Sequence, residues 1–452
     1  MKKRPDALKE GEDMGSYVPN TPEERQEMLR ECGFAGFDDL YRDIPESVRL
    51  RTPLDILEGR SELEVRRTME KMAEKNTVFR HIFRGAGAYR HYIPAIVNTI
   101  ASKEEFRTAY TPYQAEISQG VLQNIFEYQT EICELTGLEA SNASVYDGAV
   151  AAAEACEMCR ERKRSRILVS AAVDPKILSV VKTYSFGRNV EVTVVPEREG
   201  VTDLQALKEL LAPDVSCLLI QHPNFFGNLE EMELAVRTVH EAGAKVIVSC
   251  NPISLALLKA PGEYGADIAV GEGQPLGMPL SYGGPYLGFM AADKKMMRKL
   301  PGRIVGQTKD SEGNRTFVLT LQAREQHIRR EKASSNICSN EALCALRAAA
   351  YLAAMGPEGL LQAAIQCTSK AHYLQEKLAE AGCRPVYENA EFFHEFVTAC
   401  PDADAVLEAL KKEGILGGLP LGENRILWCA TEMNTKEEID RVAAICREVT
   451  GA

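Results

Sequence analysis

Features that would indicate a membrane protein, a secreted scaffold or a nucleic-acid partner are missing from this sequence. No apolar run approaches the ~20 residues that a membrane-spanning helix needs. The formal net charge is −12, which argues against nucleic acid or an anionic membrane surface as a partner. The basic start, MKKR, is not followed by an apolar segment. We therefore expect no secretory signal and predict a cytoplasmic protein.

Cysteine is present, but its spacing is not that of a disulfide scaffold or a metal centre. Thirteen cysteines in 452 residues are too sparse for a disulfide framework, and we expect reduced thiols. Cys156 and Cys159 form one CxxC inside a strongly helical stretch, without a second CxxC or clustered histidines. We interpret them as helix-surface or core thiols, and the sequence predicts no metal site.

The composition is that of an ordinary globular protein, with 45% hydrophobic and 26% charged residues. The length allows two or three domains with a large core. We predict an N-terminal arm with short helices over 1–60, a large α/β domain over 61–325 and a small C-terminal α/β domain over 326–452. Thr21, Pro22 and Glu24 make a capping box that predicts a first helix ending before Gly33.

Apolar strands alternate with helical segments between residues 141 and 270. The expected strands lie at 167–170, 190–196, 215–223, 244–250 and 267–270. Nearly continuous apolar strands between helices indicate a mainly parallel sheet covered on both faces. Ligands of such sheets bind at the carboxyl ends of the strands. A helix expected to start near Asp147 and Gly148 would offer free N–H groups to an anion there.

Three polar segments are candidates for a site, and each also has a plain structural interpretation. A glycine-rich loop at 83–94 is part of a site's wall or a surface turn. The segment at 110–119 lines a polar pocket or packs against the following amphipathic helix, on whose apolar face we place Ile117. Residues 324–336 bind a phosphate or carboxylate, or form a solvated face, and the Ser-Ser-Asn turn is expected to cap an Ala-rich helix. The candidate residues are Arg90, His91, Tyr110, Tyr113, Gln114, Glu116, Ser118, Gln119, Arg324, Gln326, His327, Arg329, Arg330, Lys332, Ser334, Ser335 and Asn336.

The stretch from Gly265 to Gly288 sets a short strand before a loop that contains six glycines. In a pyridoxal phosphate (PLP) enzyme of the aspartate-aminotransferase fold, the Schiff-base lysine follows such a strand. Gln274 stands in that place, and the stretch contains no lysine. An amide cannot form a Schiff base. The preceding strand ends at Asn251, without the carboxylate that usually pairs with the pyridine nitrogen. Residues 302–315 between this region and the basic segment are expected to form a polar excursion.

Long motifs carry a resemblance to a known family. They are YVPNTP from Tyr17, AYTPYQAEISQGVLQ with FEYQT, ASVYDGAVAAAEA, GEGQPLGMPLSYGGP and LQAREQHIRREKASSNIC. The chain resembles the P-protein (glycine decarboxylase) family of the glycine cleavage system, and within it the α-type subunit. The resemblance implies PLP-dependent transferase fold type I, with Tyr17 among the site candidates.

The resemblance also implies a function shared between two chains. A β-type subunit would hold PLP covalently, and this chain would hold none. The complex, expected to be α₂β₂, would decarboxylate glycine and pass the aminomethyl group to the lipoyl arm of H-protein. Two alternatives remain at this point. The chain could be a non-catalytic scaffold of the complex, or an independent PLP enzyme that uses Lys245, at a strand start, or Lys259, expected on a helix.

Overall fold

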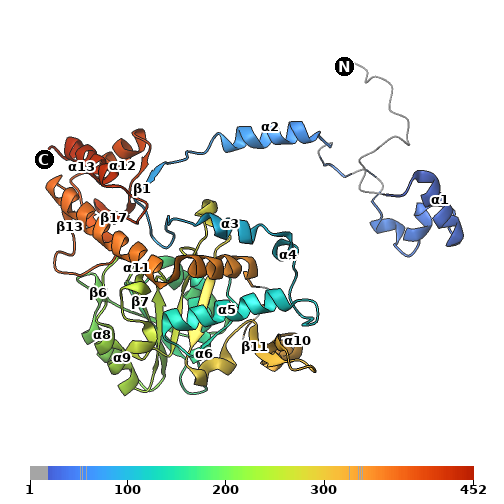
Figure 1. Cartoon of the computed structure of the whole chain (residues 1–452), viewed down its shortest axis with the longest axis horizontal. Coiled ribbons are helices and arrows are strands. Elements are labelled where there is room, and N and C mark those ends of the chain that lie inside the picture. Colours follow the sequence, from blue (N-terminus) through green and yellow to red (C-terminus); the bar gives the residue numbers. More distant parts are fainter. Residues whose placement is uncertain are drawn as a thin grey trace, which may run out of the picture. The chain divides into compact units, whose positions relative to one another are not determined.

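The computed structural model describes residues 19–50, 52, 54–56, 59–324, 326–333, 335, 337 and 340–452 (Figure 1). The chain divides into two compact units, 1–77 and 78–452. The domain boundaries expected after residues 60 and 325 stay predictions. No helix in the described part of the chain is long and apolar enough to cross a membrane.

Among its described residues, the N-terminal unit has two α-helices, and the first begins with the predicted capping box. Helix α1 (Pro22–Glu31) has Thr21 as N-cap. The Thr21 hydroxyl accepts the Glu24 N–H, and the Glu24 carboxylate accepts the Thr21 N–H. Helix α2 (Glu62–Ala73) begins in the same way at Ser61. Two 3₁₀ turns lie between them, η1 (Phe37–Tyr41) and η2 (Glu46–Val48). Every residue of α2 is exposed, so the capping box at Ser61 stabilises its start and no buried face contributes.

A seven-stranded sheet forms the centre of the second unit, as the alternating pattern predicts. Its order is β2-β10-β9-β8-β7-β3-β4, and β10 runs antiparallel to its neighbours β2 and β9. The neighbours among β9, β8, β7, β3 and β4 are parallel. The strands are β2 (Ala140–Ser141), β3 (Arg166–Ser170), β4 (Val192–Val195), β7 (Val215–His222), β8 (Lys245–Cys250), β9 (Ile268–Glu272) and β10 (Gly288–Ala292).

Helices cover both faces of this sheet, which explains why the strands are apolar throughout. On β7, Leu218 and Ile220 pack into the core formed with α5, α9 and α11, whereas Cys217 and Leu219 pack into the core under α6 and α7. Helices α5 and α11 lie side by side across their face (Figure 1). The helices are α5 (Gln119–Thr136), α6 (Gly148–Cys159), α7 (Pro175–Gly187), α8 (Leu204–Leu210), α9 (Met232–Glu241) and α11 (Ala342–Glu380).

The C-terminal part builds a second, smaller sheet in the order β13-β14-β17-β16. Its core contains Trp428, whose indole N–H donates to Thr398 at 2.8 Å. Strand β15 is not part of this sheet and pairs in parallel with β1. The elements are β1 (His81–Ile82), β13 (Arg384–Pro385), β14 (Glu395–Ala399), α12 (Ala403–Lys412), β15 (Ile415–Leu416), β16 (Leu419–Gly422), β17 (Arg425–Cys429) and α13 (Lys436–Thr450).

The remaining elements are short and connect these parts. Before α5 come α3 (Ala95–Ala101) and α4 (Glu104–Arg107), and β5 (Glu197–Arg198) pairs with β6 (Val201–Thr202). Short helices surround the β9–β10 region and the basic segment. They are η3 (Ser254–Ala256), η4 (Pro261–Tyr264), η5 (Ser281–Gly283), η6 (Lys294–Lys299), η7 (Gln322–Arg324), α10 (Gln326–Arg329) and η8 (Arg330–Lys332).

Four local predictions are wrong. The expected polar excursion at 302–315 belongs to a β-hairpin of β11 (Ile304–Lys309) and β12 (Arg315–Thr320), closed by a turn in which Asp310 accepts two backbone N–H groups. The Ser-Ser-Asn turn does not cap α11, which begins after Glu341. Ile117 precedes α5 and is 79% exposed. Lys259 lies in a loop between η3 and η4, not on a helix.

Candidate functional site

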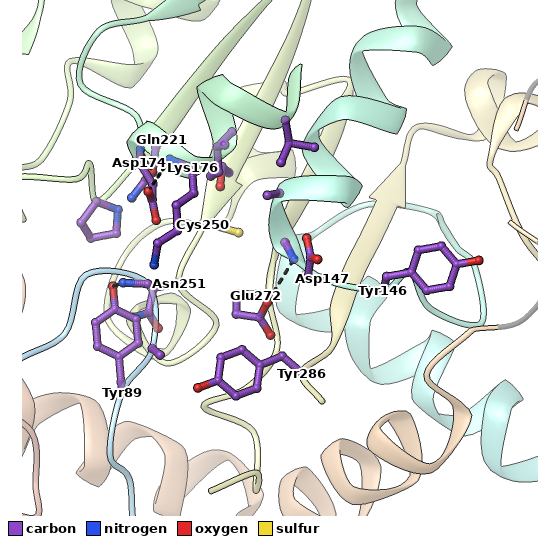
Figure 2. A pocket seen from close by; sticks show the side chains of 18 of the residues that line it. Tyr89, Tyr146, Asp147, Asp174, Lys176, Gln221, Cys250, Asn251, Glu272 and Tyr286 are labelled. Carbon is purple, nitrogen blue, oxygen red and sulfur yellow. Dashed lines mark hydrogen bonds between the residues drawn. The ribbon is translucent and has the colours of Figure 1, made fainter. Parts of the chain in front are cut away.

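A cavity of about 740 Å³ lies at the carboxyl ends of the parallel strands, where such sheets bind ligands. Strand β7 contributes Gln221, β8 ends in the cavity at Asn251, and β9 contributes Glu272. The loop before α3 supplies Tyr89, and His394 and Glu395 come from the C-terminal sheet. Figure 2 shows Lys176 extending from the start of α7 toward Asn251. The prediction of a site at these strand ends is thus met by a cavity of suitable size.

Gln274 does not face this cavity freely, because its side chain is bonded to the backbone. The side-chain oxygen accepts the Tyr89 N–H at 2.8 Å. The amide nitrogen donates to the Tyr89 carbonyl at 2.9 Å and to the Met278 carbonyl at 2.8 Å. The residue is 1% exposed. Gln274 therefore clamps the loop of Tyr89 against the end of β9.

Glu272 occupies the place at which the start of α6 would offer its N–H groups to an anion. Its carboxylate accepts the N–H of Gly148 at 3.1 Å (Figure 2). It also accepts the N–H of Gln274 at 2.9 Å and of Leu287 at 3.0 Å. The backbones approach closely here: a Cβ on Gly148 would lie 2.8 Å from the Glu272 nitrogen. Burial raises the pKa of Glu272 to about 7 despite these three donors.

The cavity is acidic. Asp147, Asp174, Glu272, Glu341 and Glu395 line it, and Lys176 is the only lysine or arginine lining it in the described part of the chain. Burial raises the pKa of Glu395 to about 7, although its carboxylate accepts the hydroxyl of Tyr89 and the N–H of Ala86, both at 2.7 Å. Burial lowers the pKa of His394 to about 3, which keeps this imidazole neutral. The cavity therefore suits neither a phosphate nor another strong anion.

The site predicted from the sequence is only partly brought to this cavity. The loop at 83–94 does reach it, through Gly87, Ala88 and Tyr89. The two candidates from that loop are held elsewhere: Arg90 donates to the Arg80 carbonyl at 2.6 Å, and His91 bonds to Glu432 at 2.8 Å. Neither lines the cavity.

The candidates at 110–119 lie on a different surface. Tyr110 is 82% exposed, and Gln114 and Glu116 are exposed beside it. The Tyr113 hydroxyl accepts a bond from Arg303 at 2.7 Å. Two of these candidates are half-buried. The Gln119 side chain exchanges two hydrogen bonds with the Phe317 backbone. Ser118 is the N-cap residue of α5, without a side-chain cap bond.

The basic segment is also largely on the surface. Arg329, Arg330 and Lys332 are exposed, whereas Arg324 and Gln326 are half-buried, and Arg324 bonds to the Leu300 carbonyl. The Ser335 hydroxyl donates at 2.9 Å to Glu154 on α6, two residues before Cys156. Tyr17, Ser334 and Asn336 lie outside the described residues, and the His327 side chain does too. Cys156 and Cys159 are both buried, as core thiols.

Sequence reasoning missed most residues of the cavity. Glu272 stands two residues before Gln274, so a carboxylate at the end of β9 was a usable signal. Tyr89 belongs to the loop at 83–94, from which only Arg90 and His91 are among the predicted site residues. His394 and Glu395 follow from no local pattern, because the fold brings them some 120 residues back to the end of β9.

A sequence model of the glycine cleavage system P-protein matches residues 15–446. The chain belongs to this family. A relative from Moorella thermoacetica, named "Probable glycine dehydrogenase (decarboxylating) subunit 1", is 53% identical over 96% of this chain and 99% of its own length. A crystal structure of glycine decarboxylase (P-protein) in inhibitor-bound form has a TM-score of 0.90 at 44% identity, covering 96% of this chain and 100% of that one.

More distant structures confirm the predicted fold class. An aspartate aminotransferase from Thermus thermophilus superposes with a TM-score of 0.57 at 18% identity, covering 82% of this chain and 99% of that one. The fold is therefore that of fold type I PLP enzymes. The residues of this cavity nevertheless do not fit PLP. Gln274, where we expect the lysine from the sequence pattern, has a fully bonded amide, Asn251 at the expected pyridine position is not a carboxylate, and the Glu272 carboxylate accepts the α6 N–H that a phosphate would use.

Proposed function

We propose that this chain is the α-type subunit of glycine decarboxylase in the glycine cleavage system. In this proposal a β-type subunit holds PLP through a lysine, and the two chains together decarboxylate glycine and pass the aminomethyl group to the lipoyl arm of H-protein. PLP on the partner supplies the electron sink for decarboxylation. The observation that carries the proposal is Gln274, locked into backbone bonds, in a chain that matches subunit 1 relatives over nearly its whole length.

We infer that the exposed candidates form the surface that meets the partner. Ile117 is 79% exposed, Tyr110 82% and Ile328 51%, and apolar side chains gathered on a surface mark interaction sites. Arg329, Arg330 and Lys332 are exposed beside Ile328 in sequence. Arginine bonds to phosphate or carboxylate groups are worth roughly 1.5–3 kcal/mol each. The basic segment, with Ser334, Ser335, Asn336 and His327, is proposed to complete the partner's active site or the approach of H-protein.

The alternative is a scaffold that only stabilises the β-type subunit. Exposure of Tyr110, Gln114 and Glu116 favours contact with a partner but does not distinguish a catalytic contribution from a structural one. An independent PLP enzyme has less support. Lys245 pairs with Glu161 and Lys259 with Glu233, and neither lysine lines the cavity.

Reconstitution tests the proposal. The chain alone, a β-type subunit alone and the mixture are assayed for glycine-dependent aminomethylation of lipoylated H-protein, and size-exclusion light scattering tests the α₂β₂ assembly. We expect activity only in the mixture. Borohydride reduction with PLP, followed by peptide mass mapping, should find the stoichiometric adduct on the β-type chain. Lys176→Met controls for adventitious reaction of the lysine in the cavity. Glycine decarboxylation by the isolated chain contradicts the proposal.

The scaffold alternative is separated from it by kinetics. If the exposed candidates contribute to the site, variants at Arg329 or Tyr110 change kcat or KM in an assembled complex of normal stoichiometry. If the chain is a scaffold, the same variants change only the amount of complex that forms.

A further inference from the structure

A cluster of three side chains lies buried outside the cavity, at the junction between the large sheet and the C-terminal sheet. It consists of His91 from the loop before α3, Cys367 from the second half of α11 and Glu432 from the turn after β17. One potential ligand atom from each lies within 4.8 Å of the others. In the described part of the chain no other group of three such residues approaches so closely. Because the members are far apart in sequence, no spacing motif reveals them.

Burial sets this cluster apart from surface groups of similar residues. The His91 side chain is 1% exposed and that of Glu432 is 11% exposed, and Cys367 is fully buried. The histidine nitrogen and the cysteine sulfur both contact the same oxygen of the Glu432 carboxylate. Oε2 of Glu432 lies 2.8 Å from Nδ1 of His91 and 3.3 Å from Sγ of Cys367. The other oxygen, Oε1, accepts the Tyr92 N–H at 2.6 Å and so fixes the carboxylate.

We propose that His91, Cys367 and Glu432 bind a divalent transition-metal ion, with zinc the best match. Imidazole nitrogen, thiolate sulfur and carboxylate oxygen are the ligands of zinc in proteins, at about 2.0–2.3 Å. Tetrahedral bonds of that length separate the ligand atoms by about 3.3–3.7 Å. The sulfur–oxygen distance already meets this, and the nitrogen–oxygen pair has to open by less than about 1 Å. The nitrogen–sulfur pair lies within 4.8 Å and has to close by up to about 1.5 Å.

The charges of the ligands suit a buried dication. Binding releases the thiol proton, so that a thiolate and a carboxylate balance the two charges of zinc. The proton in the His91–Glu432 hydrogen bond moves to Nε2 of His91, and the neutral imidazole donates the lone pair of Nδ1. A buried centre without net charge avoids the large cost of burying an unpaired ion. Lys370 is a cation that would repel a bound metal ion. Its ammonium donates to the main-chain carbonyl of Glu432 and not to the carboxylate.

A further buried polar atom supports a ligand at this junction. The hydroxyl of Tyr351 has no hydrogen-bond partner among the described residues. Burial raises the pKa of this hydroxyl, and the charges of Glu432 and Cys367 add to the rise. Such orphaned groups are rare in a folded interior. A water completing the coordination of the metal would give the Tyr351 hydroxyl an acceptor or a donor.

The site would join three segments of the second unit: the loop that carries Tyr89 into the cavity, helix α11 and the C-terminal sheet. Zinc would thus hold the cavity loop and the C-terminal sheet together, a structural role that does not depend on the proposed decarboxylase activity.

Metal binding to the full-length chain tests the proposal directly. The chelator-treated protein is titrated with Zn²⁺, and bound zinc is measured after gel filtration. Co²⁺ serves as the spectroscopic probe, because a thiolate ligand gives a charge-transfer band in the near ultraviolet. We expect one ion per chain, that band, and a higher unfolding temperature with zinc. Cys367→Ser should abolish the band, and Glu432→Gln should weaken zinc binding by more than about tenfold.

The control variants use thiols outside the cluster. Cys32→Ser removes the exposed thiol and Cys446→Ser removes a buried one, and both should keep the site. A wild-type chain without stoichiometric zinc overturns the proposal whatever the variants do. So does a cobalt band that Cys367→Ser leaves intact, or zinc binding that Glu432→Gln does not change. In those cases the cluster is only a set of hydrogen bonds.

Discussion

Gln274→Lys places a lysine where fold type I enzymes carry theirs, and we expect it to weaken the fold without creating an active site. The wild-type amide serves one donor and two acceptors in the backbone, at 2.8–2.9 Å. Lysine has three donors and no acceptor, so it can serve the carbonyls of Tyr89 and Met278 but leaves the Tyr89 N–H unpaired. A buried donor without a partner costs about 1–3 kcal/mol.

The charge adds to that cost. Gln274 is 1% exposed, so an ammonium there is desolvated, and the two carbonyls offset only part of the penalty. We therefore expect a loss of at least about 2–3 kcal/mol. Thermal unfolding followed by circular dichroism measures it as an apparent midpoint lower by several degrees. Gln205→Lys is the matched control: this exposed glutamine bonds to Glu209 at 2.9 Å, and lysine can keep that contact.

The chemical result should also be negative. The variant still has Asn251 just after β8, and the Glu272 side chain still bonds to the start of α6. PLP would therefore find neither a carboxylate for its pyridine nitrogen nor a free site for its phosphate. Absorbance of the purified variant with PLP, and borohydride trapping, test this. A variant as stable as the wild type would refute the reasoning about the clamp. A variant that decarboxylates glycine without a partner would refute the reasoning about the site.

Three further predictions address other residues. Glu272→Ala frees the Gly148 N–H and should give the chain weak inorganic phosphate binding, measurable by calorimetry, that the wild type lacks; equal heats for both proteins would contradict this. Burial raises the pKa of Glu395 from 4.5 to about 7, so the folded state binds the extra proton and stability falls as the pH rises from about 4.5 to about 7. Glu395→Gln should remove up to about 3 kcal/mol of that fall in denaturation curves taken across this range, and an unchanged profile would count against a buried neutral carboxyl. Arg329→Ala and Ser335→Ala should each cost about tenfold or more in the rate of the reconstituted complex; an effect on folding yield alone would identify a solvated face.

The layout of the sheet could be predicted because it depends on local patterns. Continuous apolar runs such as 215–222 mark buried parallel strands, and capping residues such as Thr21 and Asp147 mark helix starts. Parallel strands must place their carboxyl ends along one edge, so the place of the cavity followed as well. The hairpin of β11 and β12 differs from the predicted polar excursion, because the inner ends of its strands are polar, with Gln307, Thr308 and Lys309 before the turn and Arg315 and Thr316 after it. Asp310 and Gly313 between the strands are nevertheless a turn signal.

The contents of the cavity could not be predicted in the same way, because they depend on contacts between distant segments. Tyr89 and Glu395 are 306 residues apart, and their hydrogen bond exists only after the C-terminal sheet docks. The expected cap of α11 failed for a related reason. The Ser335 hydroxyl bonds to Glu154 on α6, and the helix starts only after Glu341. Local propensity offers a cap, but a tertiary contact decides where the serine goes.

Two positions at which we expect a PLP enzyme to hold its cofactor make other contacts here. Gln274 holds the loop of Tyr89, and Glu272 holds the start of α6 together with Leu287. Each replacement satisfies backbone groups that would otherwise be buried without partners, at a cost of about 1–3 kcal/mol apiece. Restoring one cofactor ligand therefore breaks a structural contact before it adds any chemistry.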